Sequence, residues 1–141
     1  MARNYATAAD LQEWTGAAPP ANAAGLLRSA SSLVERDTLT AIYAHDTDGY
    51  ATEPGTATAF REAVCAQAAF WAANGLDPTA GALGIQAERV ASSKSIKGAS
   101  VSYDTADAAA TKAARVAALE TLCSEAWRIL STAGLTPAGV R

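Results

Sequence analysis

Apolar residues recur at three- and four-residue steps along much of the chain, which is the spacing of helices that bury one face. Thr7 is a good N-cap, so a short first helix is predicted to run to about Trp14, where Gly16 and Pro19-Pro20 end it. Asn22 is then expected to cap a second helix. The apolar stripe of this second helix consists of Leu26, Leu27, Ala30, Leu33, Val34 and Ile42.

A third helix follows a loop, residues 45–55, that is dense in Gly, Pro and Asp. It is predicted to begin at Thr56 or Thr58 and to end at Asn74-Gly75, a typical left-handed stop. Its apolar stripe consists of Phe60, Val64, Ala68 and Trp71.

Asp104, Thr105 and Asp107 are the candidate caps of the last helix, which is expected to continue as one helix to Gly134. Trp127 lies at the edge of its apolar face. The stripe itself consists of Val116, Leu119, Leu122, Cys123, Ala126 and Leu130.

Before the last helix the pattern changes to alternation, which indicates a β-hairpin over about residues 87–104. A turn at Lys97-Gly98 places Ile96, Val101 and Tyr103 on one face with the stem of Lys94. Serines occupy the opposite face. Because a lone two-stranded hairpin is marginally stable, this one must pack on its own helices or on another chain.

Residues 135–141 have no helical pattern, and Pro137 and Gly139 prevent continuation of the last helix. We expect an extended tail that becomes ordered against a partner. Leu135 and Val140 are its candidate apolar anchors, with Arg141 at the rim.

These elements predict a single domain, residues 1–141, of mainly α class. The expected architecture is a small bundle of about four helices, with one β-hairpin inserted before the last helix and an extended C-terminal tail. About a quarter of the residues are alanine, so the core is thin and the few aromatic side chains must supply much of its bulk. Assembly with further copies could add burial that a monomer lacks.

The formal net charge is −3, so there is no basic excess for binding nucleic acid through its phosphates. No apolar run is long enough to span a bilayer, and the start of the chain lacks a signal peptide. Cys65 and Cys123 lie in apolar helical contexts without Cys-x-x-Cys spacing, which favours free, buried thiols over a disulfide or metal site. Arg89, Lys94, Lys97, Lys112 and Arg115 form either a solvated face or a surface complementary to an acidic partner.

The chain shows no catalytic, cofactor-binding or metal-binding motif. His45 has no second histidine or cysteine nearby, so a zinc site is not expected. Asp46-x-Asp48-Gly49 matches part of a calcium loop, but its glycine comes too early and Ala57 stands where a bidentate acid is needed. The serines lack a histidine partner and lie in no nucleophile motif.

Four stretches in this order resemble the head-to-tail connector, or adaptor, proteins of long-tailed phages, especially those that infect actinobacteria. They are the opening Tyr5-Ala-Thr-Ala-Ala-Asp-Leu11, the helix Phe60-Arg-Glu-Ala-Val-Cys-Ala-Gln-Ala-Ala-Phe-Trp71, the hairpin Ser-Ile-Lys-Gly-Ala-Ser-Val-Ser-Tyr103, and the ending Leu130-Ser-Thr-Ala-Gly-Leu135. The resemblance covers most of the chain.

This resemblance implies a structural protein of the virion neck, made in the host cytoplasm and without enzymatic activity. About twelve copies would form a closed ring between the portal protein and a downstream stopper or tail protein, and DNA can pass through such a ring. No membrane and no sequence-specific nucleic acid is expected as a partner. The hairpin and the tail are then the partner-binding segments, with candidate residues Ser92, Lys94, Ile96, Lys97, Val101, Tyr103, Leu135, Val140 and Arg141.

Two other classes of protein stay open. Another phage neck or tail completion protein is one, although such proteins tend to be richer in β-structure. A small helical regulator that binds a protein or DNA is the other; for DNA it would need a basic recognition helix, which the sequence does not show. An enzyme is disfavoured because no catalytic constellation is present.

Overall fold

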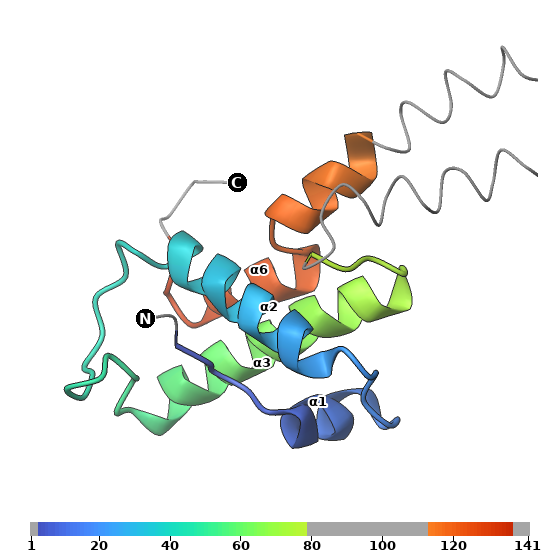
Figure 1. Cartoon of the computed structure of the whole chain (residues 1–141). Coiled ribbons are helices and arrows are strands. Elements are labelled where there is room, and N and C mark those ends of the chain that lie inside the picture. Colours follow the sequence, from blue (N-terminus) through green and yellow to red (C-terminus); the bar gives the residue numbers. More distant parts are fainter. Residues whose placement is uncertain (1–2, 79–112, 137–141) are drawn as a thin grey trace, which may run out of the picture.

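The computed structural model describes residues 3–78 and 113–136, and this part of the chain is mainly helical. Its helices are α1 (Ala8–Thr15), α2 (Ala23–Asp37), α3 (Pro54–Ala73) and α6 (Ser124–Thr132), and residues 113–120 are helical as well. Helix α3 contacts each of the other three helices, so the core forms around it (Figure 1). The predicted helical class is confirmed. The predicted hairpin, residues 87–104, lies outside the described residues.

Helix α1 begins and ends where the sequence predicts. Thr7 and Asp10 form a reciprocal capping box, in which each side chain accepts a hydrogen bond from the other residue's backbone N–H. Gly16 ends the helix in the left-handed region, with a φ of 74°. Leu11 projects from this short helix into the core.

Helix α2 buries Leu26, Leu27 and Val34, as its apolar stripe predicts. The prediction for Ile42 is wrong, because α2 ends at Asp37 and Ile42 is 99% exposed. Thr38 is the C-cap of α2, and its backbone N–H and its hydroxyl both donate to the carbonyl of Val34, at 3.1 and 2.8 Å. Side-chain bonds of this kind slightly destabilise a continuing helix.

Helix α3 begins at Pro54, earlier than the predicted Thr56 or Thr58. Proline suits the first helical position because its missing N–H would have no partner there. The predicted stop is confirmed. Gly75 has a φ of 65°, and the N–H of Leu76 donates to the carbonyl of Trp71 at 2.9 Å, the pattern of a Schellman motif.

The prediction of one uninterrupted last helix is wrong. Residues 113–120 are helical, residues 121–123 are not, and α6 begins at Ser124. The break is stabilised by side chains of the neighbouring helices. Trp71 donates to the carbonyl of Ala118 at 2.8 Å, and Arg36 donates to that of Glu120 at 2.9 Å. Carbonyls that would bond to the next helical turn therefore have partners from α2 and α3 instead.

Gln67 of α3 bridges this break directly. Its side-chain oxygen accepts the backbone N–H of Cys123 at 2.6 Å, and its Nε2 donates to the carbonyl of Thr121 at 3.3 Å. Gln67 is fully buried. A buried amide is tolerated here because both of its ends are hydrogen-bonded.

The prediction that Leu135 belongs to an extended C-terminal tail is wrong. Gly134 ends α6 with a φ of 77°, and the N–H of Leu135 then donates to the carbonyl of Leu130 at 2.9 Å. This is a second Schellman motif, whose following residue commonly makes an apolar contact back to the helix. Leu135 is accordingly only 3% exposed and belongs to the core. Residues 137–141 lie outside the described residues.

An aromatic cluster ties the N-terminal segment and the α2–α3 connection to α3. Phe60 is buried and stacks with Tyr5 at a centroid distance of 4.8 Å, while Tyr43 packs on it at 5.2 Å. Tyr50 and Tyr5 form a T-shaped pair with a centroid distance of 5.8 Å. Together with the buried Trp71, these rings supply bulk that the many alanines do not.

Candidate partner-binding surface

Most of the residues that the sequence nominates for partner binding lie outside the described residues. These are Ser92, Lys94, Ile96, Lys97, Val101, Tyr103, Val140 and Arg141. Leu135 is described, and its burial in the core removes it from any exposed surface. Of the five basic residues near the predicted hairpin, Arg115 is described, and it donates to the carbonyl of Asn74 at 3.2 Å.

The connection between α2 and α3 carries the large apolar side chains that are exposed in the described part of the chain. Leu39 is 77% exposed and Ile42 is 99% exposed. The sequence interpretation missed this surface because it assigned Ile42 to the buried stripe of α2. Thr38 and Thr40 were the available signal, since threonines favour the end of a helix over its interior.

The residues on either side of Ile42 are held against the core. Ala41 and Tyr43 both pack on it, and the N–H of Ala41 donates to the carbonyl of Thr38 at 3.0 Å. The Tyr43 hydroxyl also donates to the carbonyl of Gly49 at 3.4 Å. Ile42 therefore projects into solvent from a backbone that is anchored on both sides.

The same connection contains a turn in which an aspartate bonds to the backbone. The Asp46 Oδ1 accepts the N–H groups of Asp48 and Tyr50 at 2.9 and 3.0 Å, and Gly49 has a φ of 90°. The carboxylate thus organises the turn itself, as aspartates commonly do. Within residues 3–78 and 113–136 no group of three or more His, Cys, Asp or Glu side chains is placed to hold a metal ion. His45 is exposed beside this turn.

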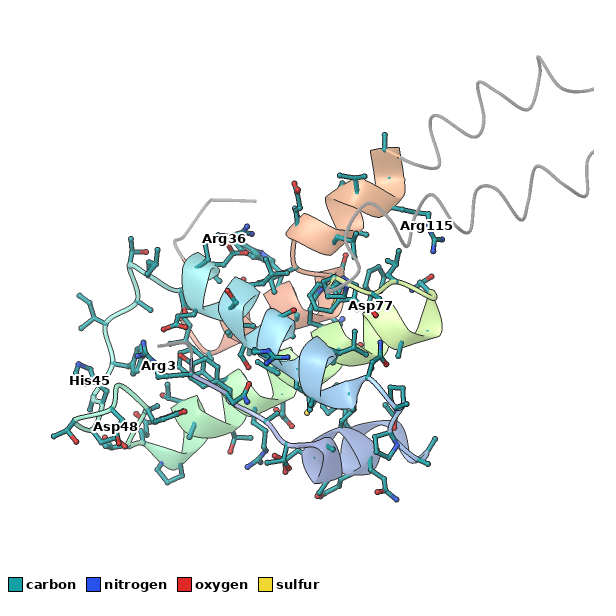
Figure 2. The ribbon with its side chains drawn as sticks, viewed as in Figure 1. Arg3, Arg36, His45, Asp48, Asp77 and Arg115 are labelled. Carbon is teal, nitrogen blue, oxygen red and sulfur yellow. The ribbon has the colours of Figure 1, made fainter. Side chains whose placement is uncertain are left out.

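Arg3 joins this turn to α2 and to the N-terminal segment (Figure 2). Its guanidinium pairs with Glu35 at 2.6 Å, donates to the carbonyl of Asp48 at 3.3 Å, and donates to the Tyr5 hydroxyl at 3.2 Å. The hydrogen bond to Tyr5 raises the pKa of Arg3, while burial raises the pKa of Tyr5. Both groups keep their neutral-pH charge states, and the turn is held in a defined position.

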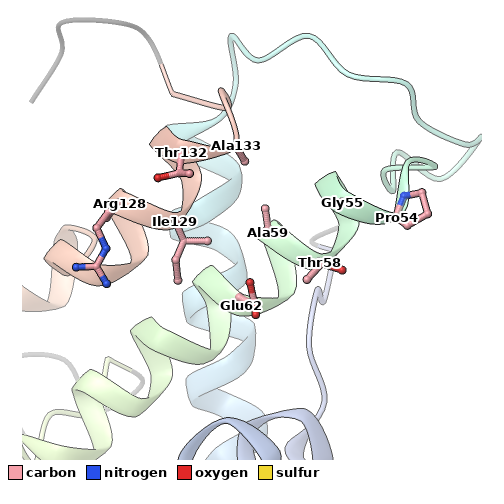
Figure 3. Close-up of a pocket in the computed structure, with 9 residues that line it drawn as sticks. All are labelled: Pro54, Gly55, Thr58, Ala59, Glu62, Arg128, Ile129, Thr132 and Ala133. Carbon is pink, nitrogen blue, oxygen red and sulfur yellow. The ribbon is translucent and has the colours of Figure 1, made fainter.

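An open groove of about 510 Å³ lies between the N-terminal half of α3 and α6 (Figure 3). Ala59 and Ile129 face one another across it, and Pro54 and Ala133 lie at the end where the α2–α3 connection passes. Glu62 also lines the groove, as does Arg128. The groove thus has an apolar floor with charged groups at its margin.

The connection and the groove differ in charge. Residues 38–53 include Asp46, Asp48 and Glu53, all exposed, and contain no lysine or arginine. At the groove, the Arg128 side chain is 73% exposed, and its contact with Glu125 is a distant 4.0 Å. An exposed pair at this distance contributes little to stability. Because Glu62 lines the groove together with Arg128, the groove carries charges of both signs.

Both cysteines are free, as the sequence predicts. Cys65 is buried in α3, and desolvation raises its pKa to about 11; burial also raises the pKa of the partly buried Cys123. A thiol with a raised pKa holds little thiolate at neutral pH and is a poor nucleophile.

Among the described residues, no helix combines the length and the apolar character needed to cross a bilayer. In the comparisons with known proteins, no family model, no curated protein and no solved structure matches the chain. The resemblance to phage connectors therefore stays a prediction from the sequence.

Proposed function

We propose that this chain is a structural subunit of a phage head-to-tail connector ring, located in the neck between the portal protein and a downstream stopper or tail protein. The proposal rests on the position, within the fold, of the stretches that resemble this family. Each of the three that fall within the described residues contributes to the core around α3. These three stretches therefore include residues that determine the fold of the body.

The opening stretch supplies Tyr5, which stacks on Phe60, and Leu11, which is buried. The second stretch is the central part of α3, from Phe60 to Trp71, and both of these end residues are buried. The last stretch ends α6 with the motif that buries Leu135 in the core. A body of this kind can present other segments to the neighbouring proteins of a ring.

In the proposed architecture, the helices form a bundle that builds the ring, and the hairpin of about residues 87–104 contacts an adjacent neck protein. The partner-binding residues are Ser92, Lys94, Ile96, Lys97, Val101 and Tyr103 of the hairpin, with Val140 and Arg141 of the tail. Leu135 is no longer included, since the core already contains it. The apolar face of the hairpin, Ile96 and Val101, would be buried on the partner.

The charge of the chain supports a role around DNA in transit. With a net charge of −3, a ring of such subunits has no excess of cations to hold phosphates. DNA could then move through the ring without tight sequence-independent binding.

The test is an assembly assay with the phage that encodes the chain. Without the protein, filled heads and complete tails should accumulate separately, as seen by electron microscopy. Supplying the wild-type protein should restore joined particles, whereas Ile96→Ser with Val101→Ser should not, although its helical circular dichroism stays nearly unchanged. Ser93→Ala with Ser100→Ala, on the opposite face of the predicted hairpin, is the matched control.

Normal joined particles formed without this protein would show that it is not a connector. A cryo-EM map of the neck adds the position of the protein. Density next to the portal supports the connector, and density further down the tail would instead identify another neck or tail completion protein.

A further inference from the structure

From the exposed side chains and the charge of the α2–α3 connection, we infer that Leu39 and Ile42 of one copy form the docking site for residues 89–103 of a second copy. The next subunit of the ring is then the partner of the predicted hairpin, and in that respect the contact rests on the proposed function. The contact itself is tested with the purified protein in solution, so the two can fail separately.

The connection presents an apolar surface in a fixed position. Leu39 and Ile42 are 77% and 99% exposed. The backbone beside them is held, because Ala41 and Tyr43 both pack on the core. A surface that is already ordered loses little conformational freedom when a partner binds, which favours association.

The same connection is acidic. The segment between α2 and α3 carries Asp46, Asp48 and Glu53, all exposed, and contains no lysine or arginine. Arg3 donates to the turn of this segment, but its charge is balanced by Glu35, with which it forms an ion pair. The surface around the exposed apolar pair therefore has a net negative charge, which suits a partner that combines apolar side chains with cations.

The chain itself contains a stretch of matching charge. Residues 89–103 include three cations and no acid, and no other stretch of fifteen residues in the chain does so. Two of these cations, Lys94 and Lys97, lie near the turn of the predicted hairpin. The acids that flank the stretch, Glu88 and Asp104, belong to the opposite end of that hairpin. Opposite charges on the two segments steer their encounter and select its orientation.

The apolar side chains of the two segments match as well. The alternation over residues 89–103 places Ile96 and Val101 on one face, and a two-stranded hairpin needs such a face to be covered. Leu39 and Ile42 are aliphatic side chains that the described part of the chain leaves exposed. Burial of these four side chains against one another supplies the driving force for the contact.

The position of the segment favours a contact between copies over a contact within one chain. Both points where residues 79–112 join the described structure lie near the C-terminal end of α3, where Arg115 donates to the carbonyl of Asn74. The connection precedes Pro54 at the other end of this helix, whose 20 residues span about 30 Å (Figure 1). A contact that joins two different surfaces of the chain is heterologous, so its repetition gives a ring where the rotation closes and a filament where it does not.

Sedimentation velocity over a series reaching about 1 mM, the range of weak contacts, measures the association. The wild-type protein should self-associate. Leu39→Ser with Ile42→Ser should weaken this association by about tenfold or more, and so should Ile96→Ser with Val101→Ser. The matched controls, which should leave the association unchanged, are Thr40→Ser and the pair Ser93→Ala with Ser100→Ala.

Charge reversal tests the pairing of the two segments. Asp48→Lys with Glu53→Lys should weaken the association, as should Lys94→Glu with Lys97→Glu. All four substitutions in one chain keep the net charge and exchange the signs of the two segments, so together they should restore the association. The control for altered net charge is Glu13→Lys with Glu125→Lys, at exposed positions of α1 and α6.

Mixing the two apolar variants separates this contact from other modes. The Leu39→Ser, Ile42→Ser protein has an intact segment 89–103, and the Ile96→Ser, Val101→Ser protein has an intact connection. Their mixture should form a one-to-one complex that does not grow, because only one productive contact is possible.

A wild-type protein that stays monomeric throughout the series would overturn the inference. So would association that is lost in the connection variant alone, since the connection would then contact another surface of the second copy. A mixture that forms no complex, or a chain with all four charge reversals that stays monomeric, would overturn it as well. If the protein still proved necessary for joining heads to tails, the proposed function would stand without this contact. Self-association by this route in a protein absent from the virion neck would remove the proposed function and leave the inference standing.

Discussion

The buried side-chain oxygen of Gln67 accepts the backbone N–H of Cys123 at 2.6 Å, and this bond joins α3 to the start of α6. The same amide donates to the carbonyl of Thr121, so one side chain satisfies backbone groups at both ends of the non-helical residues 121–123. Since both groups lie where helical hydrogen bonds are missing, no neighbouring turn replaces Gln67 if it is lost.

Replacing Gln67 with methionine, which keeps the length of the side chain, should therefore destabilise the protein. We expect the free energy of unfolding to fall by about 1–3 kcal/mol for each backbone group left without a partner. Urea denaturation measures it. Gln12→Met, on the exposed side of α1, is the control and should change stability by less than about 0.5 kcal/mol. Equal stability of the two variants would show that the bridge contributes nothing.

Gly49 should resist substitution more than other left-handed glycines. A Cβ at Gly49 would lie 2.7 Å from the Nη1 of Arg3, in addition to the strain of its φ of 90°. At Gly16, whose φ is 74°, a Cβ would meet nothing within 4 Å. Gly16→Ala should therefore lower the free energy of unfolding by the left-handed strain alone, about 1–2 kcal/mol. Gly49→Ala should lower it further.

The extra cost at Gly49 should disappear in an Arg3→Ala background, where the guanidinium is absent. Thermal melts of Gly49→Ala, Arg3→Ala and the double variant form the cycle that measures this coupling. Additive effects would show that Arg3 moves aside without cost.

Leu135 should stabilise the folded chain itself. Because it is 3% exposed, Leu135→Ala should lower the free energy of unfolding by about 2–5 kcal/mol, the usual range for a buried leucine. Leu39→Ala is the matched control and should have a small effect, since Leu39 is 77% exposed. Chemical denaturation at low protein concentration compares the two without interference from self-association.

Truncation gives an independent measurement at the same position. Ending the chain after Gly134 removes Leu135 and should lower the melting temperature, whereas ending it after Thr136 retains Leu135. The second truncation should leave the melting temperature close to that of the full chain, because residues 137–141 are predicted to act on a partner. Equal melting of both truncations would contradict the role of Leu135 in the core.

The thiol of Cys65 should make stability fall at high pH. Its pKa is raised by burial to about 11 in the folded protein, above the usual value of about 9. The neutral thiol is therefore favoured in the fold, so this contribution is fully present below pH 9 and is lost as the pH rises toward 11. The slope attributable to Cys65 should approach about 1.4 kcal/mol per pH unit in that window.

Tyrosines and lysines titrate over the same range, so the comparison is made with Cys65→Ala. The difference in unfolding free energy between wild type and variant should shrink from pH 9 to pH 11 and be constant below pH 8. A difference that is independent of pH would show that Cys65 ionises as easily in the folded protein as in the unfolded chain.

The sequence by itself determined the local features of the helices. Thr7 caps α1, Gly16 ends it, and Asn74-Gly75 and Gly134 end α3 and α6, because caps and left-handed stops depend on residues within one turn. The apolar stripes of α2 and α3 were predictable for the same reason, since a helical period places their residues on one face. The beginning of α3 at Pro54 was also a local signal, although the sequence interpretation placed it two or four residues later.

Only the tertiary structure decided where those patterns stop applying. The apolar period of the last helix runs through residues 121–123 without a change, yet side chains of α2 and α3 interrupt the helix there. Leu135 follows a glycine that ends a helix, so the sequence pattern predicts that it belongs to the tail. The Schellman geometry instead returns it to the core. Ile42 continues the spacing of α2 and is nevertheless exposed, because the helix ends at Asp37. For residues 121–123, the side chains that decide the outcome are distant in sequence. For Leu135 and Ile42, the outcome depends on the path of the chain after a helix ends. Hydrophobic spacing contains neither kind of information.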